Sequence, residues 1–212
     1  MSIEERRKRE KLERRQAILK AALDVYETEG YLGTTMEKIA ERAELSKATL
    51  YLYFKTKDEI FVHAIGANLQ SFSELLEDLY KRRKSIGDEL LEAFWDVFKQ
   101  YYDENPMAFQ LTLYYYQREM IRYLSAPLRK LLYRSGSKNV KVMHKITDYG
   151  VNKGLFKKCN PKTLAEVIWT SFLGIILLEN GKAVISQKTH IEITRDLALE
   201  ILRQGIRKGL NE

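Results

Sequence analysis

The segment that most constrains this chain is residues 34–60, TTMEKIAERAELSKATLYLYFKTKDEI. Thr34 and Glu37 have the Ser/Thr-x-x-Glu spacing of a capping box, which satisfies free backbone N–H groups where a helix begins. The helix that follows would carry a small apolar face made of Ile39, Ala40 and Ala43. Small residues let a second helix cross at close range. The segment therefore predicts a short helix from residue 34 or 35 that packs against a close neighbour.

A second short helix is predicted over residues 47–53, with Ser46 as a favourable N-cap. Leu50 and Phe54 are spaced i and i+4 and can both face inward. The side chains left facing outward or sideways are Lys47, Ala48, Thr49, Tyr51 and Tyr53. Two short helices joined by a tight turn form a helix-turn-helix, whose second helix enters the major groove of DNA.

With these residues the chain resembles the DNA-binding domain of the TetR (tetracycline repressor) family of bacterial regulators. The resemblance runs from residue 18 to about residue 60 and rests on Gly30, Thr34, Thr35, Ile39, Ala40, Ala43, Ser46, Leu50, Tyr51, Tyr53, Phe54, Lys57 and Ile60. One position departs, because the family often has Gly in the turn where this chain has Glu44. If that residue takes a positive φ, Glu costs roughly 1–2 kcal/mol relative to Gly.

Helical periodicity extends over almost the whole chain of 212 residues, and only 3 Pro and 11 Gly interrupt it. We therefore predict an all-α protein of about nine helices, over 10–29, 34–43, 47–53, 57–83, 89–104, 107–122, 125–153, 160–181 and 189–208. Residues 1–56 would form a basic arm and the helix-turn-helix domain. The resemblance implies that residues 57–212 form a helical domain for effector binding and dimerisation.

The net charge of +7 favours a polyanionic partner. Residues 1–57 are only mildly basic, with 13 basic and 10 acidic side chains, but their positive charge is clustered. The cluster consists of Arg6, Arg7, Lys8, Arg9, Lys11, Arg14 and Arg15. We expect residues 1–9 to be a mobile basic arm that adds affinity diffusely through counterion release, rather than one that inserts into the minor groove.

The cellular compartment is predicted from cysteine usage and hydropathy. Cys159 is the single cysteine, so no intramolecular disulfide can form, and a reducing cytoplasm is the simplest location. The charged N-terminus lacks the apolar core of a secretory signal. The longest apolar run, 167–178, is shorter than the roughly 20 residues that span a bilayer, so no membrane association is expected.

DNA contacts are assigned from the resemblance and from side-chain chemistry. Thr35, Tyr53 and Lys57 are predicted to contact phosphates, because they flank the two short helices. The base readers are predicted among Lys47, Thr49 and Tyr51, with Ser46 nearby. A solvated surface role is the alternative for each of these side chains.

The predicted effector site is based on aromatic density, since the chain holds 13 Tyr. A ligand pocket is mostly apolar with a few polar groups, and Tyr supplies both. The candidates for lining it are Phe98, Tyr102, Phe109, Tyr116, Trp169 and Phe172. Plain core packing is an equally good explanation of these rings. We expect a hydrophobic or amphipathic effector, such as an acyl thioester or an aromatic compound. The basic C-terminal third of the chain favours an anionic effector such as the thioester, and surface lysines explain that charge equally well.

The last two predicted helices are the candidates for a homodimer interface. The first carries Ile168, Trp169, Phe172, Ile175 and Ile176, and the second carries Ile193, Leu197, Leu199, Ile201, Leu202 and Ile206. TetR-like proteins dimerise through a four-helix bundle of this kind. The alternative is that both faces complete the core of a monomer.

No catalytic or metal-binding constellation is visible in the sequence, and no cofactor is expected. The three histidines are far apart, and there is no HExxH motif, phosphate-binding Gly loop or nucleophile elbow. We therefore predict a homodimeric transcriptional repressor that binds a palindromic DNA operator and is released by a small molecule. The alternatives are a helical ligand-binding protein or enzyme with a vestigial DNA reader, and a basic protein of membrane surfaces or the nucleoid.

Overall fold

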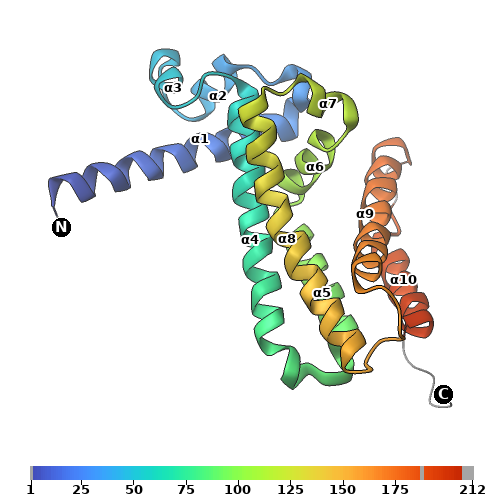
Figure 1. The fold of residues 1–212 in the computed structure, drawn as a ribbon. Helices are drawn as coiled ribbons and strands as arrows, with labels where there is room; N and C mark the ends of the chain where they lie inside the picture. Colours follow the sequence, from blue (N-terminus) through green and yellow to red (C-terminus); the bar gives the residue numbers. More distant parts are fainter. Residues whose placement is uncertain (1, 187–188, 207–212) are drawn as a thin grey trace. The chain divides into compact units, whose positions relative to one another are not determined.

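The computed structural model describes residues 2–186 and 189–206, and every regular element in these ranges is a helix (Figure 1). The helices are α1 (Ile3–Gly33), α2 (Met36–Arg42), α3 (Lys47–Tyr53), α4 (Lys57–Ile86), the short 3₁₀ helix η1 (Gly87–Glu89), α5 (Leu90–Glu104), α6 (Pro106–Tyr115), α7 (Arg118–Tyr123), α8 (Ala126–Asn152), α9 (Pro161–Ser186) and α10 (Ile191–Ile206). The all-α prediction is confirmed. The helix predicted over 107–122 is divided into α6 and α7, which accounts for the tenth α-helix among the described residues.

The first helix begins earlier than predicted, and the prediction of a mobile arm is wrong for residues 3–9. Ser2 caps α1, since its Oγ accepts from the Glu5 N–H at 3.1 Å and its own N–H donates to Glu5 Oε2 at 2.6 Å. One turn apart, ion pairs join Arg6 to Glu10 (2.8 Å), Lys8 to Glu4 (3.0 Å) and Arg9 to Glu13 (3.5 Å). Such i,i+4 pairs stabilise an exposed helix. Figure 1 shows this part of α1 extending away from α2 and α3.

Gly30 ends the long part of α1, as its position in the sequence suggested. Its φ of 66° is left-handed, and the chain then makes one further helical turn to Gly33. Glycine adopts this conformation without the steric cost of a Cβ. The kink brings Tyr31 beside the start of α4, where its phenol donates to Asp58 at 2.6 Å.

Two compact units make up the fold, and each combines two stretches of chain. The first comprises Met1–Gln70 and Asn105–Gly136, and the second comprises Ser71–Glu104 and Ser137–Glu212. The predicted boundary between residues 56 and 57 lies inside the first unit. The reason is that the first half of α4 and helix α6 share one core with the helix-turn-helix: Ile18, Ile39, Leu50, Phe54, Ile60, Phe61, Ile65, Leu111 and Tyr115.

The second unit has an aromatic core. Phe72 stacks on Tyr101 with ring centroids 4.2 Å apart and on Trp169 at 5.3 Å. Phe98 contacts Phe94 at 4.7 Å, and it also packs against Trp95, Trp169 and Phe172. Helix α9 contributes its buried face to this core. By length and composition alone α9 could cross a membrane. Its packing in the second unit gives its apolar character another explanation.

Candidate nucleic-acid interface

The helix-turn-helix begins at Thr35, which is the N-cap of α2. Its side chain accepts from the Lys38 N–H at 3.3 Å. Thr34 is buried and its hydroxyl donates to the Gly30 carbonyl at 2.7 Å, so it closes the end of α1. The expectation that Thr34 forms a capping box with Glu37 is therefore wrong. The exposed hydroxyl of Thr35 lies at the start of a helix, where backbone N–H groups and the helix dipole favour an anion.

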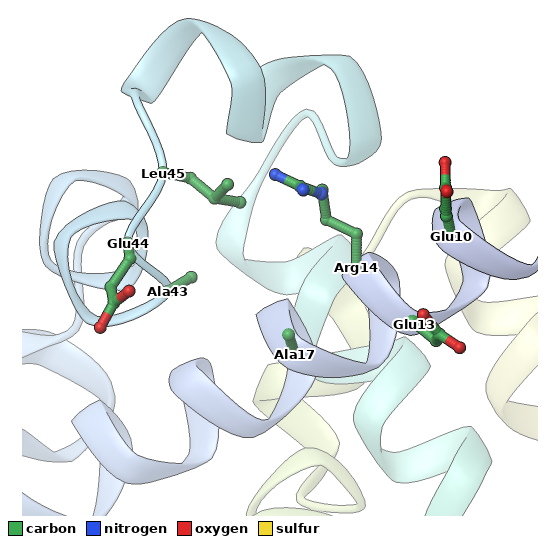
Figure 2. A pocket seen from close by; sticks show the side chains of 7 residues that line it. All are labelled: Glu10, Glu13, Arg14, Ala17, Ala43, Glu44 and Leu45. Carbon is green, nitrogen blue, oxygen red and sulfur yellow. The ribbon is translucent and has the colours of Figure 1, made fainter. Parts of the chain in front are cut away.

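The turn between α2 and α3 contains the predicted strained residue. Glu44 has φ 55° and is the one non-glycine residue with positive φ in the part of the chain that the structure describes. Beside this turn, Figure 2 shows an open hollow bordered by α1 and lined by Glu10, Glu13, Arg14, Ala17, Ala43, Glu44 and Leu45. Arg14 extends from α1 toward Leu45. The hollow is open to solvent and combines four charged side chains with the apolar Ala17, Ala43 and Leu45.

Helix α3 is fixed at both ends. At its start, Ser46 Oγ accepts from the Thr49 N–H at 3.1 Å and lies 2.8 Å from the Thr49 hydroxyl. At its end, Arg15 of α1 donates to the Tyr53 carbonyl at 3.4 Å, and its guanidinium lies 4.4 Å from the Phe54 ring centroid. A cation is favourable at the C-terminus of a helix. Leu50 and Phe54 are fully buried, as predicted, and hold α3 on the core.

The predicted base reader Lys47 is already engaged within the protein. Its ammonium forms an exposed ion pair with Glu37 of α2. This hydrogen bond raises the pKa of Lys47 and lowers the pKa of Glu37. To contact a base, the Lys47 side chain would first have to leave Glu37.

The predicted phosphate contact Lys57 also has a role inside the protein. Its Nζ donates to the carbonyls of Tyr31 at 2.7 Å and Thr34 at 3.0 Å, and it lies 4.2 Å from the Tyr31 ring centroid. Lys57 thereby satisfies carbonyls at the C-terminal turn of α1. The neighbouring Lys55 and Thr56 are exposed and flank the end of α3.

Tyr51 and Tyr53 are half-buried and pack against the core of the first unit. The exposed positions of α3 are Lys47, Ala48 and Leu52, and 79% of Leu52 is exposed. Sequence reasoning placed Ala48 among the outward residues but did not select it, and it did not consider Leu52. The signal was present, because residues 48 and 52 lie two positions either side of the buried Leu50.

Comparison with known proteins matches residues 18–64 to the family model of bacterial regulatory proteins of the tetR family. Residues 18–64 are therefore a DNA-binding domain of the tetR type. The match covers the end of α1, the whole helix-turn-helix and the start of α4, which is the segment whose geometry is described above. The protein is accordingly a DNA-binding transcriptional regulator.

A longer alignment with a transcriptional regulator extends over both units. The chain is 23% identical over 206 residues to the helix-turn-helix transcriptional regulator YhgD of Bacillus subtilis, which covers 94% of this chain and 98% of YhgD. A second B. subtilis relative, a fatty acid metabolism regulator protein, is 32% identical over 73 residues, or 34% of this chain and 38% of that protein. Both relatives are named as regulators.

Solved structures show the same fold. FadR from B. subtilis, solved in complex with stearoyl-CoA, has a TM-score of 0.69 and 22% identity, over 91% of this chain and 99% of that chain. SmeT, the repressor of the Stenotrophomonas maltophilia multidrug efflux pump SmeDEF, has a TM-score of 0.67 and 20% identity, over 92% of this chain and 91% of that chain. At these identities the likeness establishes the TetR fold.

The six candidate effector residues do not all lie in one unit. Phe98, Trp169 and Phe172 share the aromatic core of the second unit, where the Tyr102 hydroxyl donates to Asn180 at 3.0 Å. The remaining two, Phe109 and Tyr116, belong to the first unit: Phe109 is buried, while 47% of Tyr116 is exposed. The effector site stays a prediction, and four of its six residues lie in the second unit.

The aromatic core of the second unit also contains a polar group. The buried Trp95 indole N–H has no hydrogen-bond partner within the described residues, and its ring contacts Phe98 and Phe172. A metal site is not indicated, since no group of three or more His, Cys, Asp or Glu side chains in the described ranges could hold a metal ion.

The predicted dimer face on α9 is revised by the structure. Ile168, Phe172 and Ile176 are fully buried in the second unit, so they form core rather than interface. A different set of apolar side chains on α9 is exposed: Val167, Leu177, Leu178, Val184 and Ile185. On α10, three of the predicted residues are exposed in an i, i+4, i+8 stripe: Ile193, Leu197 and Ile201.

Proposed function

We propose that this TetR-family protein is a homodimeric repressor in which α3 of each subunit reads one half of a palindromic operator. The observation that carries the proposal is the construction of α3. It is anchored by Leu50, Phe54 and Arg15 on one side, while Ala48 and Leu52 are left exposed on the other. A rigidly held short helix with an exposed face is what entry into the major groove requires.

Backbone phosphates are contacted by groups around this helix. Thr35 offers an exposed hydroxyl at the start of α2, and Lys55 and Thr56 are exposed after α3. Tyr53 and Lys57 remain predicted phosphate contacts. To contact a phosphate, the Lys57 ammonium would have to give up its hydrogen bonds to the Tyr31 and Thr34 carbonyls. Because these bonds stabilise the end of α1, removal of the Lys57 side chain would also weaken that end.

The N-terminal part of α1 adds an ordered cationic stripe. Arg7, Lys11 and Arg14 are spaced i, i+4 and i+7, which places them on one face of the helix. Within the described residues, none of these three side chains forms an ion pair with a carboxylate. The nearby carboxylates of Glu10 and Glu13 are instead paired with Arg6 and Arg9. The stripe spans about 10 Å, at 1.5 Å per residue, and ends beside the helix-turn-helix turn.

Dimerisation is proposed through the exposed apolar stripes of α9 and α10. Exposed large apolar patches on a soluble protein mark interaction sites, and a two-fold protein matches a palindromic site. The test is light scattering of purified protein at micromolar concentration. Leu197→Glu combined with Ile201→Glu is expected to give a monomer, and Val140→Glu on α8 is the control that stays dimeric. A monomeric wild type, or a dimeric double variant, would contradict this interface.

The effector is proposed to be an amphipathic molecule of the acyl thioester class that enters the aromatic core of the second unit. The support is the apolar, ring-lined core with its indole N–H at Trp95, together with the fold shared with a FadR structure that holds stearoyl-CoA. By linkage, a ligand releases DNA only to the extent that it binds the DNA-free form more tightly.

Stearoyl-CoA is the probe for this part of the proposal, with free coenzyme A as the control. Both tryptophans of the chain, Trp95 and Trp169, lie in the aromatic core, so binding there changes their fluorescence. The expected result is a saturable fluorescence change together with weaker DNA binding, and neither with coenzyme A. A protein whose fluorescence and DNA affinity stay constant would exclude this ligand class.

DNA recognition is tested by capture of genomic fragments from the source organism with purified protein at physiological salt, followed by sequencing. The proposal predicts enrichment of a short palindrome and a cytoplasmic, DNA-associated protein. Capture without sequence preference would favour a nucleoid protein. Failure to capture DNA, with ligand binding retained, would favour a helical ligand-binding protein with a vestigial reader.

A further inference from the structure

The face of α3 opposite the buried Leu50 is apolar, although a DNA reader is expected to be polar. Residues in a helix are rotated by about 100° each, so Ala48 and Leu52 both lie about 160° around the axis from the buried Leu50. They therefore project directly away from the core. Leu52 is 79% exposed and Ala48 is exposed one turn before it.

The polar side chains at the start of α3 make hydrogen bonds or ion pairs within the protein. The Ser46 and Thr49 hydroxyls lie 2.8 Å apart, and Ser46 also caps the helix. Lys47 is paired with Glu37 of α2. The half-buried Tyr51 packs against the core of the first unit. Leu52 is a large, exposed side chain that can contact DNA without first breaking a polar interaction within the protein.

In the major groove one apolar feature distinguishes the base pairs, and this is the C5-methyl group of thymine. An exposed leucine gains from burial against that methyl, whereas against the polar edge of a G·C pair it would desolvate donors and acceptors without replacing their hydrogen bonds. We propose that Leu52, supported by Ala48, is a specificity-determining residue that reads a thymine methyl in each operator half-site. This inference rests on the proposed function, because it assigns part of the specificity of the same interface.

The test replaces thymine with deoxyuridine, which removes only the methyl, at each position of the captured operator in turn. Burial of one methyl-sized group corresponds to about a fourfold change in affinity. The wild-type protein is therefore expected to lose about fourfold per half-site at one thymine position, and roughly fifteenfold when both half-sites are substituted.

Leu52→Ala is expected to bind the thymine and deoxyuridine operators with affinities within twofold of each other. Because Leu52 is exposed, its truncation should not disturb the fold. Unchanged circular dichroism and melting temperature verify that the variant is folded. The matched control is Leu32→Ala, which truncates an 88% exposed leucine in the last turn of α1 and should retain the full deoxyuridine effect.

Two results would overturn the inference. One is a wild-type protein that binds its operator with unchanged affinity when any thymine is replaced. The other is a Leu52→Ala variant with the same deoxyuridine sensitivity as the wild type. Both presuppose that an operator was captured, so they are distinct from the failure of the proposed function, in which no enriched sequence is obtained.

Discussion

Asp58 at the start of α4 gives a quantitative test of what joins α6 to the DNA-reading helices. The phenols of Tyr31 and Tyr115 both donate to its Oδ1, at 2.6 and 2.7 Å. Tyr115 is fully buried, and its ring lies 6.2 Å from that of Phe61. Tyr115→Phe keeps this ring packing and removes one hydrogen bond to a carboxylate.

The magnitude follows from the type of bond that is lost. A hydrogen bond to a charged group contributes about 1.5–3 kcal/mol to the free energy of unfolding. Because Asp58 keeps the Tyr31 phenol and is only half-buried, the loss should lie at the lower end, about 1.5–2 kcal/mol. For a chain of this size that corresponds to a decrease in melting temperature of about 3–8 °C.

Urea unfolding followed by circular dichroism measures this loss, with Tyr114→Phe as the matched control. Tyr114 precedes Tyr115 on α6, and its hydroxyl has no hydrogen-bond partner among the described residues, so its variant should stay within about 0.5 kcal/mol of the wild type. Equal stability of the two variants would refute the assigned role of the Asp58 hydrogen bonds.

Three further predictions follow from the structure. Burial, and then the hydrogen bond to Asp58, raise the pKa of Tyr115. The neutral phenol is therefore favoured in the folded state, so its contribution to the free energy of unfolding is complete below pH 10 and decreases above it. Between pH 10 and 11 the wild type should lose about 1 kcal/mol more of its free energy of unfolding than Tyr115→Phe, as measured by urea unfolding. The salt dependence of operator binding is the slope of log K against log salt concentration. This slope should decrease in magnitude by about 3 per subunit in the triple variant Arg7→Gln, Lys11→Gln and Arg14→Gln. An unchanged slope would show that the cationic stripe does not contact the DNA. Glu44→Gly should raise the free energy of unfolding by about 1 kcal/mol, since φ 55° strains a side chain there, and a destabilised variant would contradict that strain.

Local patterns in the sequence were sufficient for the helix-turn-helix. The i,i+4 pair Leu50 and Phe54 is buried, Ser46 caps α3, and Gly30 takes a left-handed φ, because each depends on a few neighbouring residues. The helix at residues 3–9 could have been predicted from the same kind of signal. Ser2 and Glu5 form a capping box, and three i,i+4 ion pairs follow it.

Features that depend on distant partners were not predictable. Lys57 looks like a free cation in the sequence, but its ammonium binds carbonyls of α1 more than 20 residues away. The candidates for effector binding were chosen because they are aromatic, but they do not all lie in the same unit. Phe109 and Tyr116 lie in the first unit and the other four in the second. On α9, the side chains expected to face a partner subunit instead complete the core, and only the structure separates the two apolar faces.

In the proposed complex, two copies of α3 read adjacent major grooves. Hydroxyl-radical footprinting of the captured operator tests this arrangement, because each recognition helix protects the sugars beside its groove. We predict two protected patches on one face of the duplex, separated by about one helical turn of roughly 34 Å or a multiple of it. Uniform protection along the fragment, or a single patch at saturating protein, would contradict it.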